Sequence, residues 1–340
     1  MQLRFLARTA RLPILTRQYS DTVIPRKFGQ VQETVGPVDV ATFRRDAFEP
    51  ARPLVMRATE EDGTHSSPLP ALGKWIKPSQ DSAVFTPYIE QFSSLIVPYE
   101  LVLSATALLD EPLHQFLGHL STSRNPVQNQ LAGFLKIQID CLPQGPASET
   151  RFLQFDAPLG LMIAAFQFNE NLPAESRLKQ LYIAQVPLNT LPTELQEDVP
   201  APKLVREAGK GDVYDSSVWI GLEPTYTPWH RDPNPNLFYQ LWSSKEVRLL
   251  PPRRGEQLYL QARAKIGQSG NSRIRGPEMM EGAERQALLD AVWSAEAPEE
   301  ILRVCIGPSD ALFIPKGWWH SVRSNHDSGC PNASVNWWFR

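Results

Sequence analysis

The stretch LFYQLWSSKEVRLLP, residues 237–251, contains the pattern that decides the fold. Two apolar runs, 237–242 and 246–251, are separated by a short polar break, which predicts two strands joined by a tight turn. Similar runs bounded by Pro, Asn or Gly lie on both sides: GFLKIQI (133–139), GLMIAAFQF (160–168), QLYIAQV (180–186), SVWIGL (217–222), ILRVCI (301–306), ALFIP (311–315) and ASVNWWF (333–339). Many short strands with turn signals between them predict a mainly β fold, a double-stranded β-helix (jelly-roll) barrel.

The chain before residue 133 has a different character. Residues 40–48 predict a short helix that leads into a strand at 53–57, and the apolar spacing over 98–120 predicts a helix broken around Pro112. We therefore expect a helical or mixed N-terminal subdomain over 20–132 and a barrel over 133–340. One helical insertion is expected near 281–300.

Composition excludes several classes of protein. The chain has 340 residues, a net charge of −3, 42% apolar residues and 21% charged residues, which indicates a folded globular protein rather than a disordered one. No apolar run approaches the 18 or so residues of a membrane span. The three cysteines, Cys141, Cys305 and Cys330, are far apart and form no CxxC pair, which argues against a disulfide framework or a cysteine-rich zinc site.

Charge is unevenly distributed along the chain. Residues 1–19 contain four arginines, no lysine and no acid, with apolar residues interleaved, which is typical of a mitochondrial transit peptide. The alternative is a solvated basic arm. Removal of this segment would leave 30 basic against 37 acidic residues, a net charge of −7. We expect a mitochondrial protein, with the matrix as its compartment.

Two segments carry candidate metal ligands. His230 and Asp232 form an HxD pair in TPWHRDP, and at a strand end this spacing places both side chains on one face. His320 follows the predicted strand 311–315 within ALFIPKGWWHSV. Two histidines and one aspartate form a facial triad that leaves adjacent positions open on iron(II). Taken alone, the HxD pair is a weak signal and His320 is better explained as a core histidine.

A lysine stands fifteen residues after the first histidine. Lys245 begins the strand after the tight turn and would point into the interior of a barrel, where it could pair with an anionic ligand. Taken alone, it is better explained as a solvated turn lysine.

Together these motifs resemble the JmjC-type, cupin-like Fe(II)- and 2-oxoglutarate-dependent oxygenases, in particular the small protein hydroxylases of that family. The resemblance covers most of residues 35–340. It rests on PLVMRA (53–58), VPYEL (97–101), LYIAQVPL (181–188), SVWIG (217–221), TPWHRDPNPNLFYQ (227–240), KEVRLLPP (245–252), ALFIPKGWWHSV (311–322) and SVNWW (334–338). One departure is Trp242-Ser-Ser244, where relatives usually have a glycine, so the turn is expected to differ in type.

The resemblance implies roles for nine residues. His230, Asp232 and His320 match the iron ligands, and no further catalytic side chain is implied beyond the metal centre. Lys245 matches the lysine that pairs with the distal carboxylate of 2-oxoglutarate. The other matches are co-substrate contacts, namely Thr227, Tyr182, Asn236 and Asn336, and an aromatic residue at the substrate entrance, Trp219.

The expected function is therefore an Fe(II)- and 2-oxoglutarate-dependent dioxygenase that uses O2 to hydroxylate a protein side chain in mitochondria. The spacing of the motifs does not separate hydroxylation from demethylation. A related oxygenase acting on a modified RNA base or a small metabolite is an alternative, although the acidic mature chain argues against nucleic acid. A non-enzymatic cupin-like binding protein is a further alternative, which the complete triad argues against.

Overall fold

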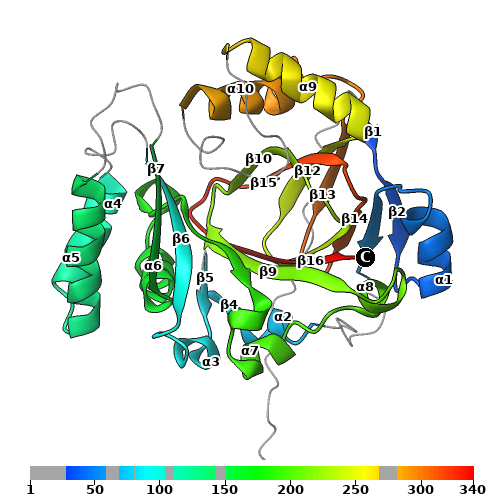
Figure 1. The fold of residues 1–340 in the computed structure, drawn as a ribbon. Coiled ribbons are helices and arrows are strands. Elements are labelled where there is room, and N and C mark those ends of the chain that lie inside the picture. Colours follow the sequence, from blue (N-terminus) through cyan, green and yellow to red (C-terminus); the bar gives the residue numbers. More distant parts are fainter. Residues whose placement is uncertain (1–27, 59–68, 80–81, 104–110, 142–150, 268–281) are drawn as a thin grey trace, which may run out of the picture.

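The computed structural model describes residues 28–58, 69–79, 82–103, 111–141, 151–267 and 282–340, and its centre is a pair of facing β-sheets (Figure 1). The predicted transit peptide, residues 1–19, lies outside the described residues. No helix in the described part of the chain is both long enough and apolar enough to cross a bilayer.

The first sheet has five strands and carries both histidines of the candidate triad. Its order is β1 (Gly29–Gln30), β13 (Leu302–Ile306), β12 (Lys245–Leu250), β15 (Trp319–Ser324) and β10 (Tyr226–Arg231). The second sheet has nine strands. Its order is β2 (Gln32–Val35), β3 (Leu54–Arg57), β14 (Ala311–Ile314), β11 (Asn236–Trp242), β16 (Pro331–Phe339), β9 (Val213–Leu222), β8 (Leu181–Pro187), β6 (Ile96–Leu103) and β7 (Arg151–Pro158).

Both strands of the opening stretch are confirmed, one in each sheet. Every residue of β12 is buried, as is every residue of β11 but the last, because each sheet is covered on both faces. The run in β11 is accordingly almost continuously apolar. In β12 the buried residues include the charged pair Glu246 and Arg248, whose side chains form an ion pair at 2.8 Å. The two large sheets face each other, so the predicted jelly roll is confirmed, and it has the form of a sandwich rather than a closed barrel.

Helices lie outside the sandwich and at its ends. The α-helices are α1 (Val40–Phe43), α2 (Ala71–Lys74), α3 (Pro87–Glu90), α4 (Glu111–Ser121), α5 (Pro126–Asp140), α6 (Gly160–Glu170), α7 (Thr193–Glu197), α8 (Lys203–Glu207), α9 (Pro252–Ala264) and α10 (Gly282–Trp293). A π-helix (Arg44–Phe48) continues α1, two short 3-10 helices occupy Ala174–Ser176 and Leu188–Thr190, and β4 (Ile76–Ser79) and β5 (Ser82–Phe85) form a separate hairpin.

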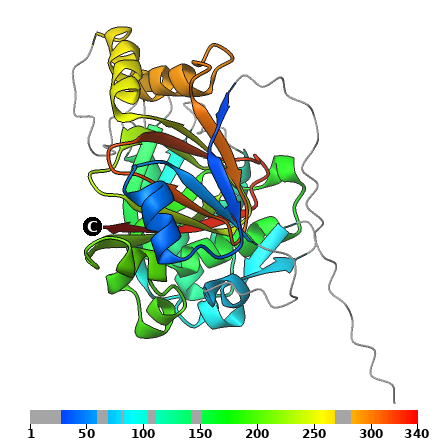
Figure 2. The same cartoon turned by 90° about the vertical axis from the view of Figure 1, so that its right-hand side faces the viewer.

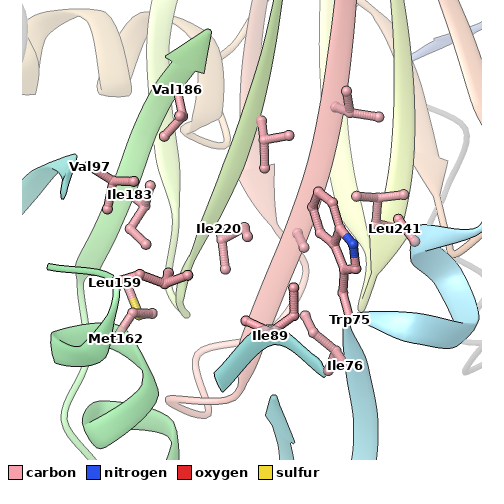
Figure 3. Close-up of a cluster of buried hydrophobic side chains, with 14 of the residues drawn as sticks. Trp75, Ile76, Ile89, Val97, Leu159, Met162, Ile183, Val186, Ile220 and Leu241 are labelled. Atoms are coloured by element: carbon pink, nitrogen blue, oxygen red, sulfur yellow. The ribbon is translucent and has the colours of Figure 1, made fainter. Parts of the chain in front are cut away.

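The larger apolar core lies against the outer face of the nine-stranded sheet. In Figure 3, Val97, Ile183 and Ile220 extend from three neighbouring strands towards Met162 of α6 and Ile89 of α3. Helix α6 is buried on nearly all sides, and its Phe166 ring stacks on Phe85 of β5 with 4.5 Å between ring centroids.

A smaller core holds α9 and α10 over one end of the five-stranded sheet, as both Figure 1 and Figure 2 show. Gly255 of α9 lies directly on Trp319, and a Cβ atom at this glycine would be 2.3 Å from the indole Cγ. The carbonyl of Gly255 accepts a 3.1 Å hydrogen bond from Trp229 Nε1. Helix α9 therefore fixes the two tryptophans that precede the candidate ligands His230 and His320.

Three predictions of secondary structure are wrong. The run 133–139 lies in α5, and the run 160–168 lies in α6, so both are helical. The predicted helix over 98–120 divides into strand β6, a segment outside the described residues, and α4. The expected subdomain boundary at 132/133 falls inside α5, and strands from both sides of it share the nine-stranded sheet.

The other predictions agree with the structure. The helix at 40–48, the strand at 53–57 and the helical insertion near 281–300 correspond to α1 with its π-helical continuation, β3 and α10. Helix α9, by contrast, is an element that the sequence patterns did not predict.

Candidate metal centre

The two strands that carry the histidines lie side by side, with His230 of β10 opposite His320 of β15. Asp232 follows two residues after His230, at the end of the strand, and lies on the same face. The Nε2 atoms of His230 and His320 are 3.8 and 3.7 Å from the two carboxylate oxygens of Asp232. One ligand atom from each residue lies within 4.8 Å of the others, so the triad converges as predicted.

Strand alternation explains how the triad is held. Trp229 and Trp319 each precede a histidine and point to the opposite face, where they are fully buried. Their rings stack with 6.0 Å between centroids. Since successive side chains alternate across a strand, burial of the tryptophans beneath α9 directs both imidazoles into the space between the sheets.

Backbone carbonyls set the tautomer of both imidazoles. His230 donates from Nδ1 to the carbonyl of Pro228 at 2.8 Å, and His320 donates from Nδ1 to the carbonyl of Trp318 at 3.2 Å. A neutral imidazole that donates from Nδ1 presents a lone pair at Nε2. Both Nε2 lone pairs are therefore available for a metal ion, in the arrangement common to metal-ligating histidines.

Asp232 is held as a carboxylate by two donors. Trp338 Nε1 and Asn236 Nδ2 donate to its Oδ2 at 2.7 and 3.0 Å. Burial raises the pKa of Asp232, but His320, His230 and the two hydrogen bonds outweigh it and hold the pKa below its ordinary value. Asn336 Nδ2 in turn donates to Asn236 Oδ1 at 2.9 Å. Two imidazoles and one carboxylate form a donor set that fits iron(II) and leaves adjacent coordination positions open.

A cavity of about 230 Å³ extends from the triad between the two sheets. The nine residues singled out from the sequence all line it, which brings the predicted metal ligands, co-substrate contacts and entrance residue together: Tyr182, Trp219, Thr227, His230, Asp232, Asn236, Lys245, His320 and Asn336.

Lys245 is the most unusual charged group of this cavity. It is only 3% exposed, and its Nζ lies 2.8 Å from Ser334 Oγ and 3.3 Å from Tyr182 Oη. Among the described residues no carboxylate lies within ion-pair distance of Nζ, which instead lies 5.4 Å from the centroid of the Phe238 ring. Burial lowers the pKa of Lys245 to about 7, against an opposing effect of Glu223. The pocket thus contains a desolvated amine that an anionic ligand would stabilise.

The turn before Lys245 keeps the backbone conformation that a glycine would favour. Ser243 has φ = 58°, and its hydroxyl donates a 2.7 Å hydrogen bond to Glu223 Oε1. Glu223 is fully buried and also accepts hydrogen bonds from Ser328 and Asn332. The expectation that the turn changes type is therefore wrong at this residue, because a side-chain contact offsets the cost of the left-handed backbone.

Sequence reasoning missed several lining residues. Ser334 and Trp338 lie two residues on either side of Asn336 on β16, and Phe238 lies two residues after Asn236 on β11. The period of two along each strand was the signal that could have found them, since residues i and i+2 share one face. The cavity is also lined by Gln185, Tyr214, Asp215, Pro233, Asn234 and Val322.

Known proteins are similar to this chain over the region that contains the triad and Lys245. The family described as a Cupin-like domain matches residues 109–340. The chain is 29% identical over 168 residues to "Lysine-specific demethylase JMJ30" of Arabidopsis thaliana, a match that covers 48% of this chain and 34% of that protein.

Two animal proteins give similar matches. "Jumonji C domain-containing protein 5" of Drosophila melanogaster is 29% identical over 167 residues, covering 46% of this chain and 36% of the relative. "Lysine-specific demethylase 8" of Danio rerio is 29% identical over 160 residues, again covering 46% and 36%. The chain thus spans about a third of the length of the curated relatives it matches.

Proposed function

Because this chain belongs to the cupin-like domain family, we propose that it is an Fe(II)- and 2-oxoglutarate-dependent oxygenase that hydroxylates a protein side chain in mitochondria. The observation that carries the proposal is one cavity with a metal-ligand triad at one end and a buried lysine without a carboxylate partner among the described residues. The relatives named above, described as JmjC-domain proteins and lysine-specific demethylases, support it.

The co-substrate fits the two ends of the cavity by charge. 2-Oxoglutarate has a keto acid at one end, suited to a metal ion, and a carboxylate at the other. His230, Asp232 and His320 would hold the iron, and Lys245 would donate a charge-assisted hydrogen bond to the distal carboxylate. Ser334 and Tyr182 hold the amine at this end through their hydroxyl oxygens. When bound, iron and 2-oxoglutarate supply the oxidising chemistry that inserts oxygen into a C–H bond.

The chain's own residues orient these groups and exclude water. The aromatic ring of Phe238 and the aliphatic Val322 also line the cavity, so part of the co-substrate would lie against apolar side chains. Trp338 and Asn236 keep Asp232 ionised and fixed in direction. A fixed carboxylate and two imidazoles of defined tautomer give a preorganised metal site, which is the protein's contribution to metal catalysis.

The mouth of the cavity is suited to a side chain of a protein substrate. Tyr214, 57% exposed, lines the cavity together with Asp215 and Asn234, which places aromatic and polar groups at the opening. Hydroxylation of a C–H bond is our proposal for the product. Demethylation uses the same bond-forming step, because a hydroxylated N-methyl group releases formaldehyde.

The mitochondrial part of the proposal is supported by the four arginines and absent acids of residues 1–19. A reporter protein fused after residues 1–30 should enter mitochondria and lose the leader. Replacement of the four arginines by glutamine should leave the same reporter in the cytosol, and uptake of that variant would contradict the assignment.

The activity is tested by measuring succinate formed from 2-oxoglutarate by purified protein with Fe(II), ascorbate and a library of mitochondrial peptides. We expect slow succinate release without peptide, and peptides that gain 16 Da by mass spectrometry. His230→Ala should abolish both. A protein that binds neither metal nor 2-oxoglutarate would overturn the proposal. Binding of both without turnover on any peptide would favour the non-enzymatic alternative.

A further inference from the structure

A second cavity, of about 200 Å³, lies beside the first, with the side chain of Tyr182 lining both. It is bounded by the start of β10, the end of β15, helix α10 and strand β6, and its lining includes Tyr226, Arg285 and Arg323. Because Thr227 lines the metal cavity, its neighbour Tyr226 faces the other side of the strand. Tyr226 is paired with Arg323 across β10 and β15.

The polar groups of this second cavity have few partners. Among the described residues, Arg285 Nε and the hydroxyl oxygen of Tyr226 are buried and have no hydrogen-bond partner. Burial raises the pKa of Tyr226, and the nearby hydroxyl of Ser321 opposes this rise only in part. The Arg285 guanidinium lies 5.1 Å from the centroid of the Tyr226 ring, and burial lowers the pKa of Arg285. Buried donors are normally satisfied, so an unpaired guanidinium nitrogen next to an unpaired hydroxyl requires an explanation.

The charged side chains that line the second cavity are two arginines, Arg285 and Arg323, and one acid, Glu100. The guanidinium of Arg323 stacks on Trp293 at 4.3 Å, and among the described residues neither it nor Arg285 has a carboxylate within ion-pair distance. Glu100 is the acidic residue that lines the cavity, and it accepts a hydrogen bond from Gln154. Asp290 also acts on Tyr226, but it is exposed and accepts a hydrogen bond from Gln286.

From this arrangement we propose that the cavity between α10 and β10 binds a small oxyanion, a phosphate or a short carboxylate, through Arg285, Arg323 and the hydroxyl of Tyr226. Guanidinium and phenol groups are suited to this chemistry, since both donate hydrogen bonds and the arginine is charged. At about 200 Å³ the cavity is smaller than sites for drug-sized ligands, so it would admit an anion of a few heavy atoms rather than a nucleotide. The proposal does not depend on the oxygenase activity.

The test uses the full-length, metal-free protein in the Lys245→Met background, which removes anion binding at the first cavity. Inorganic phosphate and malonate are titrated separately at constant ionic strength, with chloride as the reference, and binding is followed by calorimetry and by the melting temperature. We expect saturable binding of at least one anion at millimolar concentration or below. The anion that binds more tightly identifies the source, phosphate or carboxylate.

Variants locate the binding. Arg285→Gln should weaken binding at least tenfold, and Tyr226→Phe, which removes only the hydroxyl, should weaken it severalfold. Arg253→Gln, at an exposed arginine of α9, is the matched control and should bind normally. If Arg285→Gln does not fold, Tyr226→Phe alone decides. No saturable binding of either anion would overturn the proposal. Equal binding by the Lys245→Met parent and by both cavity variants would also overturn it.

Discussion

The indole nitrogen of Trp338 on β16 lies 2.7 Å from Oδ2 of Asp232, so a strand of the nine-stranded sheet holds a ligand of the triad that the five-stranded sheet carries. Asn236 on β11 makes the second such contact, at 3.0 Å. The metal site is therefore completed only when the two sheets face each other in the correct register.

Removal of the indole donor should weaken metal binding. We expect Trp338→Phe to lower the affinity for Fe(II) or Mn(II) by 10- to 100-fold, the usual effect of losing a hydrogen bond to a ligand. Trp337→Phe, on the same strand but pointing into the apolar core, is the control and should lower the melting temperature without changing metal affinity. Equal metal affinities in the two variants would contradict the role of Trp338.

Lys245→Met should separate stability from function. The pKa of Lys245 is about 7 in the folded protein against an ordinary value of 10.5, so its charge destabilises the fold fully below pH 7. This cost falls as the pH rises from 7 towards 10.5. The variant should therefore unfold at a higher temperature than the parent, with an advantage that is largest at pH 6.5 and shrinks by pH 9.5.

The same Lys245→Met variant should lose measurable 2-oxoglutarate binding. Lys265→Met, at an exposed lysine, is the control and should change neither property. An unfolding temperature of Lys245→Met that is lower than that of the parent at every pH would show that the amine stabilises the ligand-free fold.

Co-substrate binding should take up a proton. Above pH 7 most of Lys245 is neutral in the free protein, whereas a bound carboxylate would raise its pKa again. The apparent affinity for 2-oxoglutarate should therefore fall by up to tenfold per pH unit between pH 7 and 9. Calorimetry of the Mn(II) protein in two buffers of different ionisation enthalpy measures the uptake, expected near one proton at pH 8.5 and near zero at pH 6. Oxalate, which lacks the distal carboxylate arm, should bind without this uptake.

Gly255→Ala should disturb the metal site from outside the cavity. Its Cβ would lie 2.3 Å from Cγ of Trp319, so the tryptophan that precedes His320 would have to move. We expect a loss of about 3 kcal/mol in the free energy of unfolding and weaker metal binding. Gly133→Ala, in the middle of α5 with open space around it, should instead stabilise the protein by about 0.5 to 1 kcal/mol. A Gly255→Ala protein with normal metal affinity would show that α9 does not position His320.

Motif spacing predicted the site better than hydropathy predicted the elements around it. Period-two spacing predicted that His230 and Asp232 share one face at the end of β10, and the resemblance added His320 and Lys245, which line the same cavity. The run 160–168 is apolar throughout, and such a run has no periodicity that distinguishes a buried strand from a buried helix. In α6, neighbours on nearly all sides bury Leu161 to Phe166, and the helix-forming pair Ala164-Ala165 was the remaining clue.

The run 133–139 was misleading for a different reason. It is a short apolar run like those of the neighbouring strands, yet the buried residues of α5 are Leu131, Ala132 and Leu135, which follow helical spacing, while Ile137 is 61% exposed. Only the flanking Asn125-Pro126 pair, the N-cap and first residue of the helix, indicated the correct start. The period of two on β16 indicates that Ser334 shares a face with Asn336, but its contact with Lys245 depends on how the two sheets face each other, which the sequence does not indicate.

Strand β16 contacts both ends of the first cavity. Ser334 contacts the amine of Lys245 at one end, and Trp338 contacts Asp232 at the other, with Asn336 between them. Donors on one face of a strand recur only every two residues, about 7 Å apart. Ser334 and Trp338 are two such repeats apart, so one strand sets the distance between the amine of Lys245 and the triad. The spacing between the two ends of the cavity is therefore a property of the backbone rather than of any single side chain.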